Sequence, residues 1–319
     1  MFQQLGYTAN KDMSPEDADI IWVRSNYRDY LARLGRSQAL NHLPNEQLIN
    51  NKGSLAETAR LNPDWASFHP ETYCLYIYEQ MKEFFSRPRQ GIWMAKPCSS
   101  SRGIGIKLFR PSASNESLRF DSHNYVVQKY IENPYLLRNR KFSIRCYWLV
   151  TSLDPLAVYL YPEGTVKLCT QDYDDTDLTA AASHLTNSFQ NREAENYQAQ
   201  ANKLNWDRFL EQTPALDKQA LIAAMAQALG TLVDDSFGAA RTAPAAGHCF
   251  ALLAADWVLD DSNRLWLTEV QQNFGMRADD PVKQQLLPTL LEETVELVRR
   301  AMHGRGHERA ADTRFIRIR

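Results

Sequence analysis

A loop of small and hydroxyl side chains follows a lysine in the segment 93–106, WMAKPCSSSRGIGI. Because small residues let the backbone approach a ligand closely, such a loop can turn its N–H groups and serine hydroxyls toward phosphate oxygens. Lys96 would add a point charge and Arg102 a forked donor. No GK[ST] follows at the distance that a Walker A loop requires. Taken alone, the segment fits a plain hairpin turn better than a phosphate site.

Polar and apolar side chains alternate in the predicted strand around residue 143. Lys141, Ser143 and Arg145 are each two residues apart, so on a strand they share one face and point into one cleft. Two cations on one face repel each other unless an anion lies between them, and phosphate is such an anion. The spacing therefore indicates an anion-binding cleft.

Two carboxylates stand among apolar residues in the last quarter of the sequence. Asp256 and Glu269 fall in the strand candidates 250–259 and 265–270, which the turn 260–263 would join as a hairpin. A carboxylate within an apolar strand is costly unless it is paired or binds a metal. Oxygen ligands beside phosphates suit Mg²⁺. The alternative is a hairpin with an exposed polar face.

The elements that must position these side chains follow from the apolar periodicity. The region 92–170 is strand-rich, and its turn signals favour an antiparallel sheet with candidate strands at 92–95, 104–108, 125–128, 144–150, 157–161 and 166–168. Helical spacing marks 76–85, 221–232 and 287–302, and a short strand is expected at 20–23. The polar stretch 171–212 is interpreted as a surface insertion or a loop.

The composition is that of an ordinary globular protein, with 319 residues, 44% hydrophobic and 23% charged. The formal net charge of -2 gives no general attraction to nucleic acid or membrane, and no apolar stretch is long enough to cross a bilayer. The 5 cysteines show no CxxC spacing, which favours reduced thiols over a zinc site. Because the first residues do not resemble a secretory signal, we expect a cytoplasmic protein.

Seven stretches together resemble the tubulin tyrosine ligase family, which belongs to the ATP-grasp fold. The matching stretches are FHPETY at 68–73, WMAKPCSSSRGIGI at 93–106, QKYIENP at 128–134, RKFSIR at 140–145, YLYPEG followed by VK at 159–167, HLTN at 184–187, and CF to WLTEV at 249–270. They follow one another in the family's order, and the resemblance covers about residues 40–275.

The resemblance implies an α+β architecture of the ATP-grasp type, in which a nucleotide lies between two α/β lobes built on antiparallel sheets. The predicted parts are a small N-terminal α/β lobe at 1–88, a central lobe at 89–165 with the phosphate loop and adenine hinge, a C-terminal lobe at 166–303 with the metal hairpin, and a basic tail at 304–319.

The resemblance also implies the site residues. ATP would contact Lys96, Ser101, Arg102, Gly103, Ile104, Gln128, Lys129, Tyr130, Ile131, Lys141, Ser143, Thr186 and Asn187. Mg²⁺ would bind Asp256, Glu269 and Gln271, and catalysis would depend on Arg145, Lys167 and Glu269. At three of these positions the family has another residue: aspartate where Ser143 stands, arginine at Lys167 and asparagine at Gln271.

The implied activity is an ATP-dependent carboxylate–amine ligase that works through an acyl-phosphate. It would add glutamate, glycine or tyrosine to a protein or peptide carboxylate, for example on an acidic tubulin-like tail. We expect a monomer whose partners are this acceptor and a free amino acid, with no nucleic acid and no membrane. One alternative is the same chemistry on a small peptide or metabolite. Another, which Ser143 and Gln271 favour, is a pseudo-enzyme that binds nucleotide or a partner without ligation.

The last 21 residues are rich in arginine. The segment 299–319 contains seven arginines against Glu308 and Asp312. Such a segment could bind an acidic protein tail, or it could be a solvated chain end. The sequence leaves both readings open.

Overall fold

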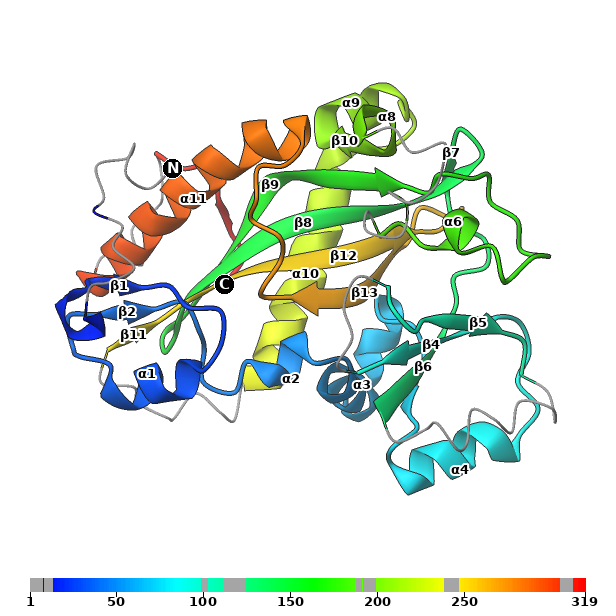
Figure 1. Ribbon diagram of the computed structural model, residues 1–319, viewed down its shortest axis with the longest axis horizontal. Coiled ribbons are helices and arrows are strands. Elements are labelled where there is room, and N and C mark those ends of the chain that lie inside the picture. The colour runs from blue at the N-terminus through cyan, green and yellow to red at the C-terminus, as the bar shows by residue number, and fades with distance from the viewer. Residues whose placement is uncertain are drawn as a thin grey trace.

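The computed structural model describes residues 8, 14–98, 103–111, 124–187, 191, 199–237, 247–304 and 312–319. Over these ranges the chain is a mixed α/β protein with sheets of seven, four and three strands (Figure 1). The two larger sheets are antiparallel, as the turn signals predicted. Among the described residues, no helix is long and apolar enough to span a membrane.

The seven-stranded sheet forms the centre of the molecule, with the strand order β10-β9-β8-β12-β13. These strands are β10 (Lys203–Asn205), β9 (Leu156–Leu168), β8 (Arg140–Leu153), β12 (Ala251–Leu259) and β13 (Leu265–Gln271). Two short strands extend it, since β7 (Leu136–Leu137) pairs with β8 and β14 (Ile316–Arg317) pairs with β9. The predicted hairpin is confirmed, because β12 and β13 pair directly.

The strands predicted at 157–161 and 166–168 imply a turn at the intervening PEG, 162–164, but the structure has no turn there. Strand β9 continues through these residues, and the pairing with β8 shifts register between Cys146 and Tyr147. A β-bulge of this kind absorbs extra residues within a strand. The two strands predicted at 157–161 and 166–168 are therefore one.

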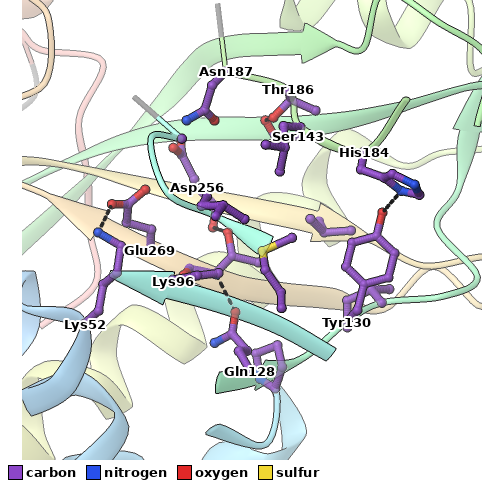
Figure 2. Close-up of a pocket in the computed structure, with 18 of the residues that line it drawn as sticks. Lys52, Lys96, Gln128, Tyr130, Ser143, His184, Thr186, Asn187, Asp256 and Glu269 are labelled. Carbon is purple, nitrogen blue, oxygen red and sulfur yellow. Dashed lines mark hydrogen bonds and ion pairs between the residues drawn. The ribbon is translucent and has the colours of Figure 1, made fainter. Parts of the chain in front are cut away.

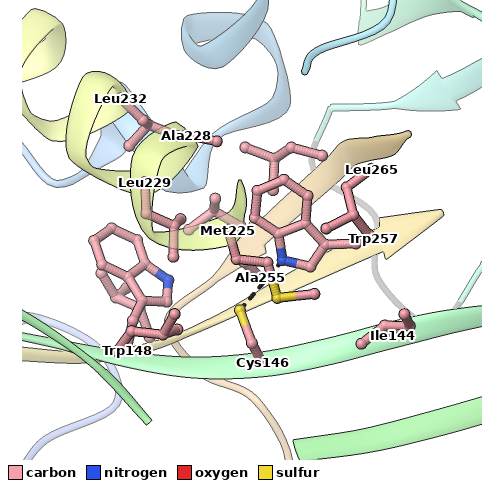
Figure 3. Packing of buried hydrophobic residues seen from close by; sticks show 14 of the residues in the cluster. Ile144, Cys146, Trp148, Met225, Ala228, Leu229, Leu232, Ala255, Trp257 and Leu265 are labelled. Carbon is pink, nitrogen blue, oxygen red and sulfur yellow. Dashed lines mark hydrogen bonds between the residues drawn. The ribbon is translucent and has the colours of Figure 1, made fainter. Parts of the chain in front are cut away.

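Two long helices cover the opposite faces of this sheet. Helix α10 (Lys218–Phe237) packs on the face that carries Ile144, Cys146 and Trp148 of β8 (Figure 3). On that face the indole N–H of Trp257 donates to Cys146 Sγ at 3.2 Å. Helix α11 (Pro281–Met302) packs on the other face, which the alternate residues Tyr147 and Leu149 occupy. The apolar periodicity predicted both helices.

Leu229 of α10 lies in this core with no exposed surface. We expect Leu229→Ala to lower the free energy of unfolding by about 3 kcal/mol, because it removes buried methyl groups and leaves a cavity. Urea unfolding followed by circular dichroism measures the change. The matched control is Leu61→Ala, since Leu61 is 81% exposed and should alter stability little. Equal losses in the two variants would contradict the assigned core.

The four-stranded sheet lies beside the open edge of β13, with the order β3-β6-β4-β5 (Figure 1). Its strands are β3 (Thr72–Cys74), β6 (Tyr125–Lys129), β4 (Trp93–Pro97) and β5 (Lys107–Phe109). Helix α4 (Tyr78–Ser86) packs on one face and α3 (Lys52–Leu61) on the other. Antiparallel pairing of β4 with β5 confirms the predicted strand pair that flanks the serine-rich segment.

The three-stranded sheet joins distant parts of the chain in parallel. It contains β1 (Ile20–Ile21), β2 (Ala39–Leu40) and β11 (His248–Cys249). The remaining short helices are α1 (Tyr27–Arg33), α2 (Gln47–Asn50), α6 (Ala181–His184), α8 (Ala199–Asn202) and α9 (Trp206–Glu211). The sheets cross the predicted boundaries at 88/89 and 165/166, because β3 joins the strands of residues 93–129 and β9 runs through 165.

The described end of the chain, 312–319, lies against the body of the protein. Strand β14 pairs with β9. The arginines around it form ion pairs, since Arg314 reaches Glu163 at 2.6 Å and Arg319 reaches Asp234 at 2.7 Å. Much of the basic charge in this segment is therefore neutralised within the molecule.

Candidate active site

A pocket of about 890 Å³, measured out to its opening, is lined by residues of both the four-stranded and the seven-stranded sheet. Of the residues predicted from the sequence, those that line it are Lys96, Gly103, Ile104, Gln128, Lys129, Tyr130, Ile131, Lys141, Ser143, Thr186, Asn187, Asp256 and Glu269. Ser101 and Arg102 lie outside the described residues. Figure 2 shows the labelled side chains converging from both sheets.

One face of strand β8, in its first half, contributes side chains to the pocket. Lys141 and Ser143 line the pocket, while the alternate residues Phe142 and Ile144 belong to the core under α10. The predicted alternation is therefore confirmed for Lys141 and Ser143, whereas Arg145, which was predicted to point into the same cleft, does not line the pocket because its guanidinium is bound to Asp256. Further along the same face, Tyr147 packs beneath α11, so the polar residues occupy the part of the strand that α11 leaves uncovered.

Lys96 enters the pocket from the end of β4. Its Nζ donates to Gln128 Oε1 at 2.6 Å and to the carbonyl oxygen of Thr268 at 3.4 Å. Burial lowers the pKa of Lys96 to about 8, while the carboxylate of Glu269 opposes this shift. The amine is thus held at the junction of the two sheets by neutral acceptors, with its charge available to an anion.

Lys141 is buried beside an aromatic ring. Its Nζ lies 3.8 Å from the centroid of Tyr130, and the Tyr130 hydroxyl is 3.0 Å from His184 Nδ1, which fixes the ring. Burial lowers the pKa of Lys141 to about 7. A bound anion would stabilise the charged form of this buried lysine and so raise its pKa.

Binding of a phosphate anion should raise the pKa of Lys141, so binding should take up protons near pH 7. We expect the affinity for Mg-ATP to fall as the pH rises from about 7 to 9, because the free protein then holds this lysine neutral. Isothermal titration calorimetry in buffers of different ionisation enthalpy measures the proton uptake. Lys141→Met should reduce that uptake. A variant with undiminished uptake would exclude Lys141 as its source.

Ser143 stands where the sequence resemblance implies a carboxylate, and it bonds to a neighbouring pocket residue. Its Oγ lies 2.8 Å from Thr186 Oγ1, and Asn187 follows on the pocket wall. The hydroxyl pair satisfies Ser143 without an ion pair. Lys141, two residues away on the same face, therefore has no carboxylate at this position to neutralise it.

Asp256 of β12 is held by Arg145 from the adjacent strand β8 and by Lys167 from β9, the next strand along. Arg145 donates to both of its carboxylate oxygens, from Nε and from Nη2, each at 2.6 Å. Lys167 Nζ lies 3.7 Å from Asp256 Oδ2. Burial alone would raise the pKa of Asp256, but Arg145 and Lys167 outweigh it and hold the pKa at about 2. Arg145 and Lys167 are not pocket-lining residues; they lie behind Asp256.

Glu269 stands directly across from Asp256, since the two residues are partners in the β12–β13 pairing. Two adjacent carboxylates on a pocket wall match the hard oxygen ligands that Mg²⁺ prefers. They would hold the metal once Arg145 and Lys52, which contact them in this structure, give way. Gln271 is differently engaged: its amide donates to Glu269 Oε2 at 2.8 Å, and its Oε1 accepts from Arg145 at 3.0 Å. It does not line the pocket, and its role as a ligand stays a prediction.

Lys52 is a pocket residue that sequence reasoning missed. It is the first residue of α3, and its Nζ lies 3.0 Å from Glu269 Oε1 (Figure 2). Asn51 caps the helix by accepting from the backbone N–H groups of Gly53 and Ser54. The position of Lys52 could have indicated a functional role, because the positive end of the helix dipole disfavours a lysine in the first turn.

Comparison with known proteins gives matches over most of the chain. A family model described as "Tubulin-tyrosine ligase family" matches residues 31–305. The chain is 29% identical over 310 residues to Tubulin polyglutamylase TTLL5 of Mus musculus, covering 89% of this chain and 23% of that protein. It is 30% identical over 304 residues to Probable tubulin polyglutamylase TTLL2 of Mus musculus, covering 89% of this chain and 55% of that protein.

A relative closer in length is Probable alpha-tubulin polyglutamylase Ttll1 of Tetrahymena thermophila. It is 25% identical over 349 residues, covering 93% of this chain and 82% of that protein. The chain thus spans about a quarter of the mouse TTLL5 protein and about half of TTLL2. Because the family model extends over residues 31–305, which hold every described pocket residue, the chain belongs to the tubulin-tyrosine ligase family.

Proposed function

We propose that this chain is an ATP-dependent carboxylate–amine ligase that adds glutamate to a protein or peptide carboxylate. One observation carries the proposal: the cross-strand carboxylates Asp256 and Glu269 share a pocket with Lys52, Lys96 and Lys141. Such a combination suits a metal-bound polyphosphate, because the carboxylates hold the cation and the lysines neutralise phosphate oxygens.

We further propose an ATP-grasp arrangement, with the nucleotide between the four-stranded and the seven-stranded sheets. The adenine would lie against 128–131 at the end of β6. The phosphates would extend past Lys96 and Lys141 toward Asp256 and Glu269. Mg²⁺, when bound there, would neutralise charge on the β- and γ-phosphates.

The reaction would begin with attack of the acceptor carboxylate on the γ-phosphorus, which releases ADP and forms an acyl-phosphate. The amine of glutamate then attacks the acyl carbon, an amide forms, and phosphate leaves. Arg145 and Lys167 lie behind Asp256, where they would support the transferred group by charge. Positioning and charge neutralisation supply most of the catalysis in phosphoryl transfer.

Glutamate is proposed over glycine and tyrosine because the relatives named above are polyglutamylases. An acidic tubulin-like tail is the proposed acceptor for the same reason. We propose a monomer acting in the cytoplasm, without nucleic acid or membrane.

The alternative, a pseudo-enzyme that binds nucleotide without ligation, was based on Ser143 and Gln271. Against it, the Ser143 hydroxyl has a hydrogen-bond partner in Thr186, and the carboxylates Asp256 and Glu269 are paired across the hairpin.

The amino acid and the acceptor can be identified together. Purified protein is incubated with Mg-ATP, separately labelled glutamate, glycine and tyrosine, and either tubulin-tail peptides or neutral peptides of equal length. We expect mass spectrometry to find labelled glutamate on the acidic peptides alone. Transfer of another amino acid would overturn the choice of glutamate. Nucleotide binding without any transfer would favour the pseudo-enzyme.

A further inference from the structure

The side chain of Gln272 leaves the end of β13 and bonds to the N-terminal part of the chain. Its Nε2 lies 2.7 Å from Glu46 Oε2, 2.8 Å from His42 Nδ1 and 3.0 Å from the carbonyl oxygen of Asn41. Its Oε1 accepts from Asn50 Nδ2 at 3.2 Å. One side chain therefore uses both ends of its amide to join segments more than 200 residues apart.

The partners of Gln272 are themselves held in place. His42 and Glu46 are 1% and 4% exposed and lie 2.8 Å apart at His42 Nδ1 and Glu46 Oε1. His42 Nε2 is 3.0 Å from the carbonyl oxygen of Val23, and the Tyr27 ring stacks on the imidazole at 4.4 Å. A buried network with its groups bonded is rigid, and loss of one member leaves costly unpaired groups.

This network reaches the active site through the short helix α2. Glu46 precedes α2, Asn50 is its last residue, and Asn51 then caps α3, whose first residue is Lys52. Gln272 thus binds the chain at both ends of α2, immediately before Lys52. On the other side Gln272 lies three residues after Glu269, the ion-pair partner of Lys52.

We propose that Gln272 is a positioning residue, which fixes Lys52 against Glu269 at the end of the pocket where the terminal phosphates and metal would bind. Gln272 does not line the pocket itself, so its effect must pass through the residues it holds. The inference rests on the proposed function, namely that this pocket binds Mg-ATP.

The first test compares two adjacent substitutions. Gln272→Met keeps the side-chain length but removes every hydrogen bond, and we expect about five- to tenfold weaker Mg-ATP binding from the loss of these part-buried bonds. Adenosine, which lacks phosphates, should bind as in the unaltered protein. The matched control is Asn273→Ala, which removes only a bond to the carbonyl oxygen of Arg24, 3.0 Å away, and should leave both affinities unchanged.

The second test is a double-mutant cycle with Lys52→Ala. If Gln272 acts through Lys52, Gln272→Met should add little to the loss in Mg-ATP affinity that Lys52→Ala causes by itself. Additive losses, equal losses for adenosine, or no loss in Gln272→Met would each overturn the proposal. Failure of the unaltered protein to bind Mg-ATP would instead overturn the proposed function. Should Gln272→Met not fold, Asn50→Ala removes the single bond to Gln272 Oε1 and is expected to weaken Mg-ATP binding in the same selective way.

Discussion

Glu269→Gln is expected to lower ATP-dependent ligation by about a hundredfold or more, since a bound metal contributes several kcal/mol to stabilising phosphoryl-transfer charge. The substitution keeps the shape of the side chain but removes its charge, and with it both the proposed Mg²⁺ ligand and the ion pair with Lys52 at 3.0 Å. ADP release in the presence of acceptor peptide and glutamate measures the rate.

The substitution Glu269→Gln should affect Mg²⁺ binding and leave binding of the nucleoside unchanged. Adenosine binding is expected to survive, whereas the Mg²⁺ concentration needed for half-maximal rate should rise. Glu296→Gln is the matched control, because Glu296 is a partly exposed residue of α11, remote from the pocket, whose ion pairs among the described residues are with Arg299 and Arg300. An unchanged rate in Glu269→Gln would exclude the proposed metal site.

Arg145→Met is expected to destabilise the fold by about 3–5 kcal/mol, because it leaves the largely buried carboxylate of Asp256, 14% exposed, without the partner that donates to both its oxygens. Urea unfolding at pH 7 measures the change. Arg299→Met is the control, since Arg299 is half exposed and its ion pair at 3.8 Å should contribute less than about 1 kcal/mol. Combining Arg145→Met with Asp256→Leu should restore part of the stability, because both buried charges are then absent.

The pH dependence follows from the pKa of Asp256. This carboxyl has a folded-state pKa of about 2, below its ordinary value of 3.8. Its contribution is therefore fully present above about pH 4 and is lost as the pH falls toward 2. In Arg145→Met the pKa of Asp256 should rise, so this acid-dependent loss of stability should diminish. An identical acid profile in both proteins would contradict the assigned ion pair.

Local periodicity was sufficient for much of the site. The alternation of Lys141, Ser143 and Arg145 placed them on one strand face, and the turn at 260–263 predicted the hairpin that brings Asp256 opposite Glu269. Both predictions concern neighbours in sequence, whose relative positions follow from the geometry of a strand or a hairpin.

Contacts between distant segments could not be predicted in this way. Lys52 meets Glu269, and Gln272 meets Glu46, only because the N-terminal part packs against the end of β13. The parallel pairing of β11 with β2 is equally remote in sequence. Nothing in the period of a single strand or helix specifies such pairings, so the predicted domain boundaries could not take them into account.

The central claim is that this pocket uses ATP to activate a carboxylate for amide formation. The most direct measurement follows oxygen-18 from the acceptor's carboxylates into the released phosphate, with Mg-ATP and glutamate present. Because the attacking carboxylate oxygen stays on phosphorus when the amide forms, we expect one labelled oxygen in the phosphate for each glutamate added. Glutamate addition with unlabelled phosphate would contradict the acyl-phosphate route, and labelled acceptor recovered unmodified would contradict ligation itself.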